Sequence, residues 1–64
     1  PRRSRHVQRM RILLIEDDPI LGDGLQVGLQ QAGYSVDWLA DGALAADALA
    51  NDEFDAVILD LALP

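Results

Sequence analysis

The sequence predicts an α/β fold in which strands and helices alternate in the order β-α-β-α-β around a parallel sheet. Two apolar runs, 12–15 and 56–59, lack the polar alternation of a half-exposed strand, which indicates strands buried on both faces of a parallel sheet. Segments with helical spacing separate the strands and are long enough for the crossovers that parallel pairing requires. Right-handed crossovers then place helices on the faces of the sheet.

The first strand is expected over 11–15 and is followed by three acids, Glu16, Asp17 and Asp18, and then by Pro19. Asp18 stands in the N-cap position of the next helix, and Pro19 stands in its first turn, where a missing N–H costs nothing. We therefore interpret Asp18 as a helix cap and not as a ligand.

The first helix is expected to run for about three turns and to end before Gly33, which can adopt the left-handed conformation of a C′ residue. Its apolar residues recur at spacings of three and four, so we expect one stripe of them to pack on the sheet. The residues of this stripe are Ile20, Leu21, Leu25, Gly28, Leu29 and Ala32.

The second strand is expected over 35–39, where polar and apolar residues alternate, so it is less buried and lies at an edge. Asp41 and Gly42 mark a turn or cap before a short alanine-rich helix over 43–50. The third strand is expected over 56–60. The packing residues expected in the second helix are Leu44, Ala45, Ala48 and Leu49.

Composition limits the class of protein. A chain of 64 residues, of which 50% are hydrophobic, forms at most one small domain with a folded core. It has no cysteine, which excludes disulfides and thiolate metal sites and fits a reducing compartment. No apolar run approaches the roughly 20 residues that span a bilayer. We therefore expect a cytoplasmic protein with no membrane partner.

Charge is distributed unevenly along the chain, whose formal net charge is −6. All five arginines lie within the first eleven positions, and all eleven acids lie from Glu16 onward. An acidic body repels nucleic acid and anionic membranes and attracts cations. We interpret residues 1–9 as a basic extension, either upstream of the native domain or foreign to it, although a nucleic-acid-binding arm is an alternative. The folded part is expected over 10–64.

Acids follow two of the predicted strands at their carboxyl ends. If the first and third strands are parallel neighbours, Glu16, Asp17 and Asp60 emerge together at the edge where such sheets place their sites. Crowded carboxylates repel one another, and a divalent cation relieves the repulsion. Oxygen ligands without His or Cys favour Mg²⁺. Mg²⁺ beside a nucleophilic aspartate prepares phosphoryl transfer, which would form an aspartyl phosphate.

Four motifs carry a resemblance to a known family: 11–19 (RILLIEDDP), 33–34 (GY), 40–42 (ADG) and 54–64 (FDAVILDLALP). Together they resemble the amino-terminal half of a response-regulator receiver domain, of the subfamily that joins a receiver to a winged-helix DNA-binding domain. The resemblance covers 10–64. It implies a flavodoxin-like doubly wound sheet with strand order 2-1-3, as a truncated receiver from which the remainder of the domain is absent.

The resemblance also implies roles for individual residues. Asp60 becomes the phospho-acceptor nucleophile, which takes a phosphoryl group from a sensor histidine kinase with Mg²⁺ as cofactor. Asp17 becomes a direct Mg²⁺ ligand and Glu16 a ligand through water, with Asp60 and the backbone carbonyl of Ala62 completing the set. Such a chain is a phosphorylated signalling domain and not an enzyme. It controls transcription, and meets DNA, only through a carboxy-terminal domain outside this sequence.

A full receiver also supplies further strands and helices, a hydroxyl residue and a lysine, whereas this chain has no lysine. We therefore expect the isolated chain to be a poor or inactive phospho-acceptor, because groups that stabilise phosphoryl charge are missing. We also expect the third strand to present an unpaired edge, which is open to a dimer or a swapped oligomer.

Three other functions remain open. A non-catalytic cation-binding or interaction module would lack Mg²⁺-induced changes in Trp38 fluorescence, provided that Trp38 lies near enough to report them. A nucleotide-binding β-α-β unit would use Gly22, Gly24 and Gly28, but their spacing misses G-x-G-x-x-G by one residue and they fall within the expected helix. A haloacid-dehalogenase-type phosphatase would need an acid at the position of Ala62.

Overall fold

A computed structural model describes residues 9–60 of the chain. Its elements are β1 (Arg11–Glu16), α1 (Pro19–Gln31), β2 (Ser35–Leu39), α2 (Gly42–Asn51) and β3 (Ala56–Asp60). The predicted order is confirmed, and each boundary lies within a residue or two of the expected one. Within residues 9–60, no helix is long and apolar enough to cross a membrane.

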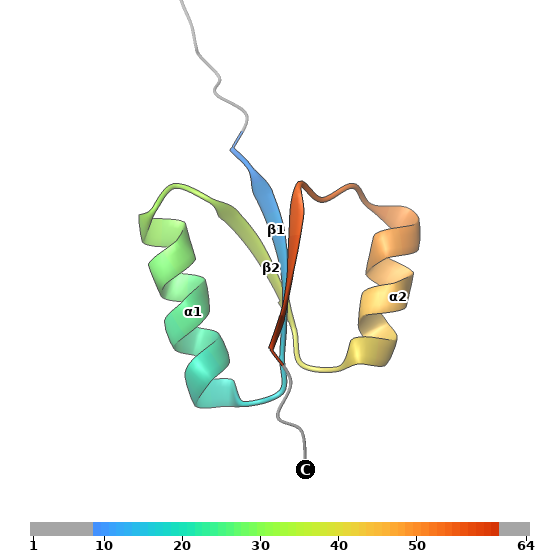
Figure 1. Cartoon of the computed structure of the whole chain (residues 1–64), viewed down its shortest axis with the longest axis horizontal. Coiled ribbons are helices and arrows are strands. Elements are labelled where there is room, and N and C mark those ends of the chain that lie inside the picture. The colour runs from blue at the N-terminus through green and yellow to red at the C-terminus, as the bar shows by residue number, and fades with distance from the viewer. Residues whose placement is uncertain (1–8, 61–64) are drawn as a thin grey trace, which may run out of the picture.

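The three strands form one parallel sheet in the order β2-β1-β3. Figure 1 shows the sheet nearly edge-on, with α1 on one face and α2 on the other. The predicted doubly wound, flavodoxin-like arrangement with strand order 2-1-3 is therefore confirmed. Because β1 is central, its carboxyl end lies between those of its two neighbours.

The core is centred on β1. Its residues from Ile12 to Glu16 are buried on both faces, as the unbroken apolar run predicts. On the α2 face, Leu13 and Ile15 pack against Ala45 of α2. Partly buried apolar residues complete this cluster: Leu39, Ala48 and Phe54.

Both helices begin at aspartate caps. Asp18 accepts hydrogen bonds from the backbone N–H of Ile20 at 2.9 Å and of Leu21 at 3.3 Å, so its predicted capping role is confirmed. Asp41 caps α2 in the same way. Gly33 has φ of 102°, which confirms the left-handed C′ residue after α1.

The predicted packing face of α1 is wrong. Of the predicted stripe, Leu29 is half-buried, whereas the others are exposed: Ile20, Leu21, Leu25, Gly28 and Ala32. The buried residue of α1 is Gly22, which was not in the stripe. A small residue is needed at this contact because the indole of Trp38 from β2 lies against Gly22. Periodicity alone could not identify a glycine as the contact point. In α2, Ala45 and Ala48 pack as predicted, whereas Leu44 and Leu49 are exposed.

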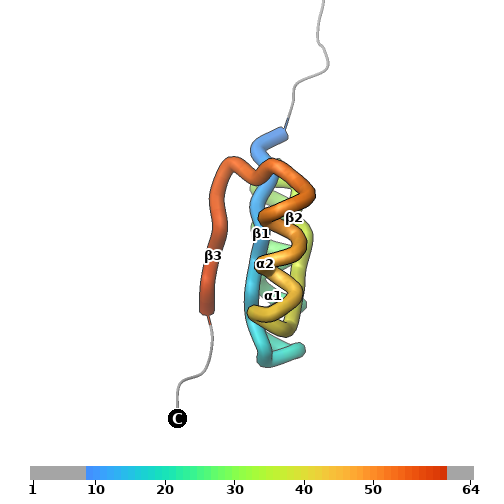
Figure 2. The backbone as a smooth tube through the Cα atoms, turned by 90° about the vertical axis from the view of Figure 1, so that its right-hand side faces the viewer, coloured from blue at the N-terminus to red at the C-terminus, as the bar shows by residue number. Residues whose placement is uncertain are grey.

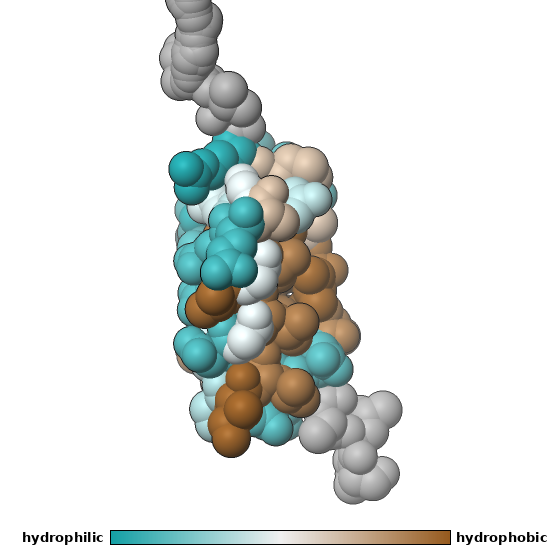
Figure 3. Space-filling view, turned by 90° about the vertical axis from the view of Figure 1, so that its left-hand side faces the viewer, coloured by the Kyte–Doolittle hydropathy of each residue, from teal (hydrophilic) through white to brown (hydrophobic). Residues whose placement is uncertain are grey.

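Strand β3 is the least covered element. Figure 2 shows it to one side of both helices, and among the described residues neither helix packs against it. Val57 and Leu59 are therefore 45% and 66% exposed, although the apolar run predicts a strand buried on both faces. The space-filling view from the α1 side also shows much apolar surface (Figure 3). The large apolar residues of α1 that are exposed are Ile20, Leu21, Leu25 and Val27.

Candidate functional site

The acids at the carboxyl edge of the sheet come from adjacent strands. Glu16 of β1 pairs in register with Asp60 of β3, so the last residues of the two strands lie side by side. Asp17 follows Glu16 directly, in the loop that leads to α1. The predicted convergence of two strand ends is therefore present in the fold, and it follows from the strand order.

Glu16 is a buried carboxylate, with only 2% of its surface exposed. Its Oε2 accepts a hydrogen bond from the backbone N–H of Asp18 at 2.9 Å. Its Oε1 is buried, and no donor from residues 9–60 reaches it. A buried oxygen without a partner carries an unrecovered desolvation cost, which a bound cation would offset.

The surroundings of Glu16 make ionisation of its carboxyl group less favourable than in water. The N–H of Asp18 lowers the pKa of Glu16, but burial and the neighbouring carboxyl groups of Asp60 and Asp17 outweigh it, so the pKa is raised above 4.5. Carboxyl groups crowded at one edge of the sheet repel one another when they are ionised, and this repulsion makes the site attractive to a cation.

The other predicted site residues are more accessible. Asp17 and Asp60 are exposed at the edge of the sheet, where a ligand can reach them. Ala62, whose carbonyl was predicted as a metal ligand, lies outside the described residues. Asp18, which was not predicted as a ligand, is occupied in capping α1.

A metal fits the chemistry of these donors, but the described residues form only part of a metal site. Among residues 9–60, no group of three or more His, Cys, Asp or Glu side chains is arranged to hold a metal ion. Buried Glu16 with its orphaned oxygen, beside the accessible Asp17 and Asp60, supplies the hard oxygen ligands that Mg²⁺ prefers. Water, which Mg²⁺ retains readily, can fill the remaining positions.

Sequence reasoning missed two residues beside these acids. The indole Nε1–H of Trp38 donates a hydrogen bond to the backbone carbonyl of Glu16 at 3.0 Å, so Trp38 is close to the site. Its ring lies where a Cβ on Gly22 would be. A glycine inside a helix costs about 1 kcal/mol relative to alanine, so it often has a packing reason. The presence of a glycine inside the predicted helix was therefore the sequence signal that could have identified Gly22 as a packing contact.

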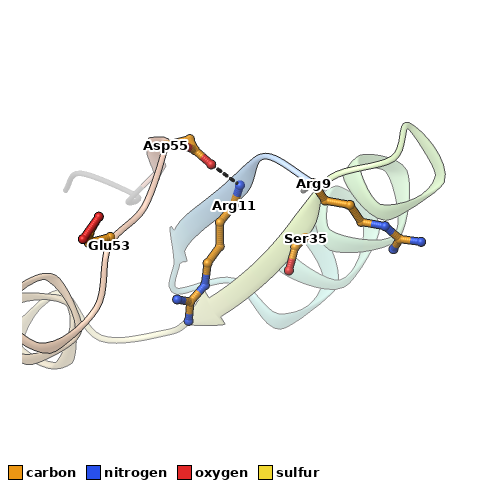
Figure 4. Close-up of a pocket in the computed structure, with 5 residues that line it drawn as sticks. All are labelled: Arg9, Arg11, Ser35, Glu53 and Asp55. Atoms are coloured by element: carbon orange, nitrogen blue, oxygen red, sulfur yellow. Dashed lines mark hydrogen bonds between the residues drawn. The ribbon is translucent and has the colours of Figure 1, made fainter. Parts of the chain in front are cut away.

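A pocket of about 400 Å³ lies elsewhere and does not belong to this site. It is lined by residues near the amino ends of the strands: Arg9, Arg11, Ser35, Glu53 and Asp55. Figure 4 shows Arg9 and Glu53 pointing away from Arg11, and the backbone N–H of Arg11 donating to Asp55 at 2.7 Å. Acidic and basic side chains line the pocket together, so it offers no single charge to a ligand.

Arg11 is committed to structure. Its guanidinium donates to Asp37 at 2.8 Å, approaches Asp52 at 3.6 Å and lies 4.7 Å from the centre of the Phe54 ring. The hydrogen bond with Asp37 raises the pKa of Arg11. Arg11 therefore ties β1 to β2 and to the segment after α2.

Comparison with known proteins identifies the family. The sequence profile of the response regulator receiver domain matches residues 12–64. The chain belongs to this family. The receiver is 56% identical over 55 residues to the transcriptional regulatory protein QseB of Haemophilus influenzae, and the match covers 86% of the receiver and 25% of QseB.

Two further relatives are also named response regulators or transcriptional regulators. The receiver is 54% identical over 55 residues to the response regulator protein PmrA of Pseudomonas aeruginosa, covering 86% of the receiver and 25% of PmrA. It is 38% identical over 55 residues to the transcriptional regulatory protein CutR of Streptomyces coelicolor, with 86% and 25% coverage. The receiver thus spans about a quarter of the length of these relatives. No solved structure matches it.

The glycines of the nucleotide-binding alternative lie inside α1. Gly22, Gly24 and Gly28 therefore do not form a loop that could surround a phosphate, and Gly22 is buried against Trp38. The receiver fold does not offer a phosphate loop at this position.

Proposed function

We propose that this chain carries the phosphorylation site of a two-component signalling protein. Asp60 accepts a phosphoryl group from the phosphohistidine of a sensor histidine kinase. Mg²⁺ is held at the same edge by Glu16, Asp17 and Asp60, with the carbonyl of Ala62. The observation that carries the proposal is the in-register pairing of Glu16 with Asp60, together with the buried, unpartnered Oε1 of Glu16.

Each acid has a separate task in this proposal. Asp60 is exposed at the end of β3, so a donor can approach its carboxylate oxygen, which bonds to phosphorus and yields an aspartyl phosphate. Asp17 is exposed in the loop after β1 and serves as the direct metal ligand. Glu16 is buried and acts through water. When bound, Mg²⁺ neutralises charge on the phosphoryl oxygens.

The isolated chain performs this reaction poorly. The sequence contains no lysine, and a positively charged group beside the phosphoryl oxygens stabilises the charge that develops during transfer. Mg²⁺-dependent, stoichiometric labelling of the isolated chain by acetyl phosphate would contradict this part of the proposal.

The names of the relatives support a wider role. QseB and CutR are named transcriptional regulatory proteins. We propose that phosphorylation of Asp60 controls transcription, and that DNA is bound by a further domain outside this sequence. The acidic body of the chain is unsuited to bind DNA itself. Such signalling takes place in the cytoplasm.

A chimera tests the proposal directly. The matched 55 residues of Haemophilus influenzae QseB are replaced by those of this chain, so that the relative supplies the remainder of the protein. We expect acetyl phosphate and Mg²⁺ to label the chimera at Asp60, and Asp60→Asn to abolish the label. Asp23→Asn, which changes an exposed acid of α1, serves as the matched control and keeps the label.

Two results would count against the proposal. Labelling that persists in Asp60→Asn would place the acceptor elsewhere. A folded chimera that binds Mg²⁺ but takes no label would favour the non-catalytic cation-binding module.

A further inference from the structure

Trp38 connects the sheet to the loop that carries the acids. It lies on β2 in register with Leu14 of β1, and its indole reaches along the α1 face of the sheet. Its Nε1–H donates to the carbonyl of Glu16 at 3.0 Å. A side chain of β2 thus contacts the backbone at the end of β1.

This hydrogen bond takes the place of a backbone hydrogen bond between β1 and β2, which the sheet lacks at Glu16. The pairing of β1 with β2 ends at Ile15 and Leu39, so Glu16 lies one residue beyond that ladder. A buried carbonyl without a partner costs free energy comparable to a lost hydrogen bond. The indole N–H therefore stabilises the Glu16 backbone where β2 has stopped.

The same ring also fixes the start of α1. A Cβ at position 22 would overlap the Trp38 indole, so only glycine allows this approach. The N–H of Gly22 donates to the carbonyl of Asp18 at 2.8 Å, in the first turn of the helix. The indole consequently touches both ends of the acidic loop: the strand end before it and the helix start after it.

We propose that Trp38 is a positioning residue for the acidic site, with its indole seated against Gly22 and bonded to the Glu16 carbonyl. It fixes the backbone of residues 16–18 next to the end of β3, which carries Asp60, before any metal binds. Mg²⁺ binding to these acids is then sensed at the indole N–H. This inference rests on the proposed metal role of the acids.

Nuclear magnetic resonance on the ¹⁵N-labelled chain tests the proposal. During a Mg²⁺ titration of the wild-type chain, we expect the Trp38 indole signal to move with the same midpoint as the amide signals of Asp17 and Asp60. Trp38→Phe keeps an aromatic ring but removes the donor. It should weaken Mg²⁺ binding about fivefold, the effect of one lost hydrogen bond.

The control variant is Tyr34→Phe, which removes a polar group from a half-buried aromatic residue just before β2. Its Mg²⁺ midpoint should equal that of the wild type. This comparison separates loss of the indole donor from a general effect of changing an aromatic side chain.

Each outcome has a distinct meaning. If the acids of the wild-type chain respond to Mg²⁺ while the indole signal stays still, or if Trp38→Phe binds Mg²⁺ as tightly as the wild type, the positioning role is overturned and the proposed function stands. If no wild-type signal responds to Mg²⁺, the proposed function fails and the inference fails with it. The indole measurement needs no variant, so it decides the question even if Trp38→Phe does not fold.

Discussion

Glu16 is suited to bind a cation, and without a cation its buried carboxylate is unfavourable for folding. Its carboxylate is buried at the end of β1, one oxygen receives the N–H of Asp18, and the other has no donor among the residues described. Sequence reasoning identified Glu16 and Asp60 because both follow apolar strands. It could not identify Trp38 as their neighbour, since that contact depends on the packing of α1 against β2.

The raised pKa of Glu16 leads to a prediction about pH. The folded chain binds the proton of the Glu16 carboxyl group more tightly than the unfolded chain does. Protonation of Glu16 therefore stabilises the folded state fully below pH 4.5, and this stabilisation is lost as the pH rises through the raised pKa of the folded state. Glu16→Gln removes the charge at every pH. In Mg²⁺-free urea unfolding, we expect the variant to become more stable than the wild type as the pH rises toward neutrality.

Mg²⁺ provides the matched condition for this experiment. Saturating Mg²⁺ should stabilise the wild type and reduce the advantage of Glu16→Gln, because the cation compensates the buried charge. If the stability advantage of Glu16→Gln over the wild type became smaller with rising pH in Mg²⁺-free buffer, this result would contradict the raised pKa of Glu16.

At the scale of the element, α1 shows which parts of a helix the sequence determines. Its ends depend on local chemistry, so the Asp18 cap, the Pro19 start and the Gly33 C′ residue were all predictable. Its packing face depends on the partner surface. Apolar periodicity favoured Leu21 and its neighbours, whereas the indole of Trp38 requires Gly22 at the contact.

The cap makes a separate prediction. Asp18→Ala removes the acceptor for the N–H groups of Ile20 and Leu21, and should lower the free energy of unfolding by about 1 kcal/mol. Urea unfolding measures the loss. Asp23→Ala, an exposed change within α1, should cost less than about 0.5 kcal/mol. Equal losses in the two variants would argue against a capping role.

At the scale of the whole molecule, the parallel β-α-β-α-β order followed from the sequence pattern, whereas the strand order 2-1-3 was implied by the resemblance to receiver domains, and the structure has both. The exposure of β3 followed from neither. The apolar run 56–59 predicts burial on both faces, but the two helices cover β1 and β2. Coverage depends on how many elements surround a strand, which its own sequence does not encode.

The exposed edge of β3 predicts self-association. Its outer backbone groups are unpaired within the described sheet, and Val57 and Leu59 are exposed, so a second copy of the chain can pair there. Sedimentation velocity should show association that rises with concentration. Val57→Lys should weaken it by placing a charge on the edge strand, whereas Leu44→Lys, an exposed change on α2, should not.

A monomer at all concentrations would contradict the edge prediction. Equal loss of association in Val57→Lys and Leu44→Lys would assign it to general apolar surface and not to the edge of β3.

The most direct test of the account is a Mg²⁺ titration of the chain followed by the backbone amide signals of Glu16, Asp17 and Asp60. We predict saturable shifts at these residues that are abolished in Asp17→Asn and retained in Asp23→Asn. Shifts that are absent, or that are the same in both variants, would contradict the claim that the carboxyl edge of this sheet is the metal-binding part of a phosphorylation site.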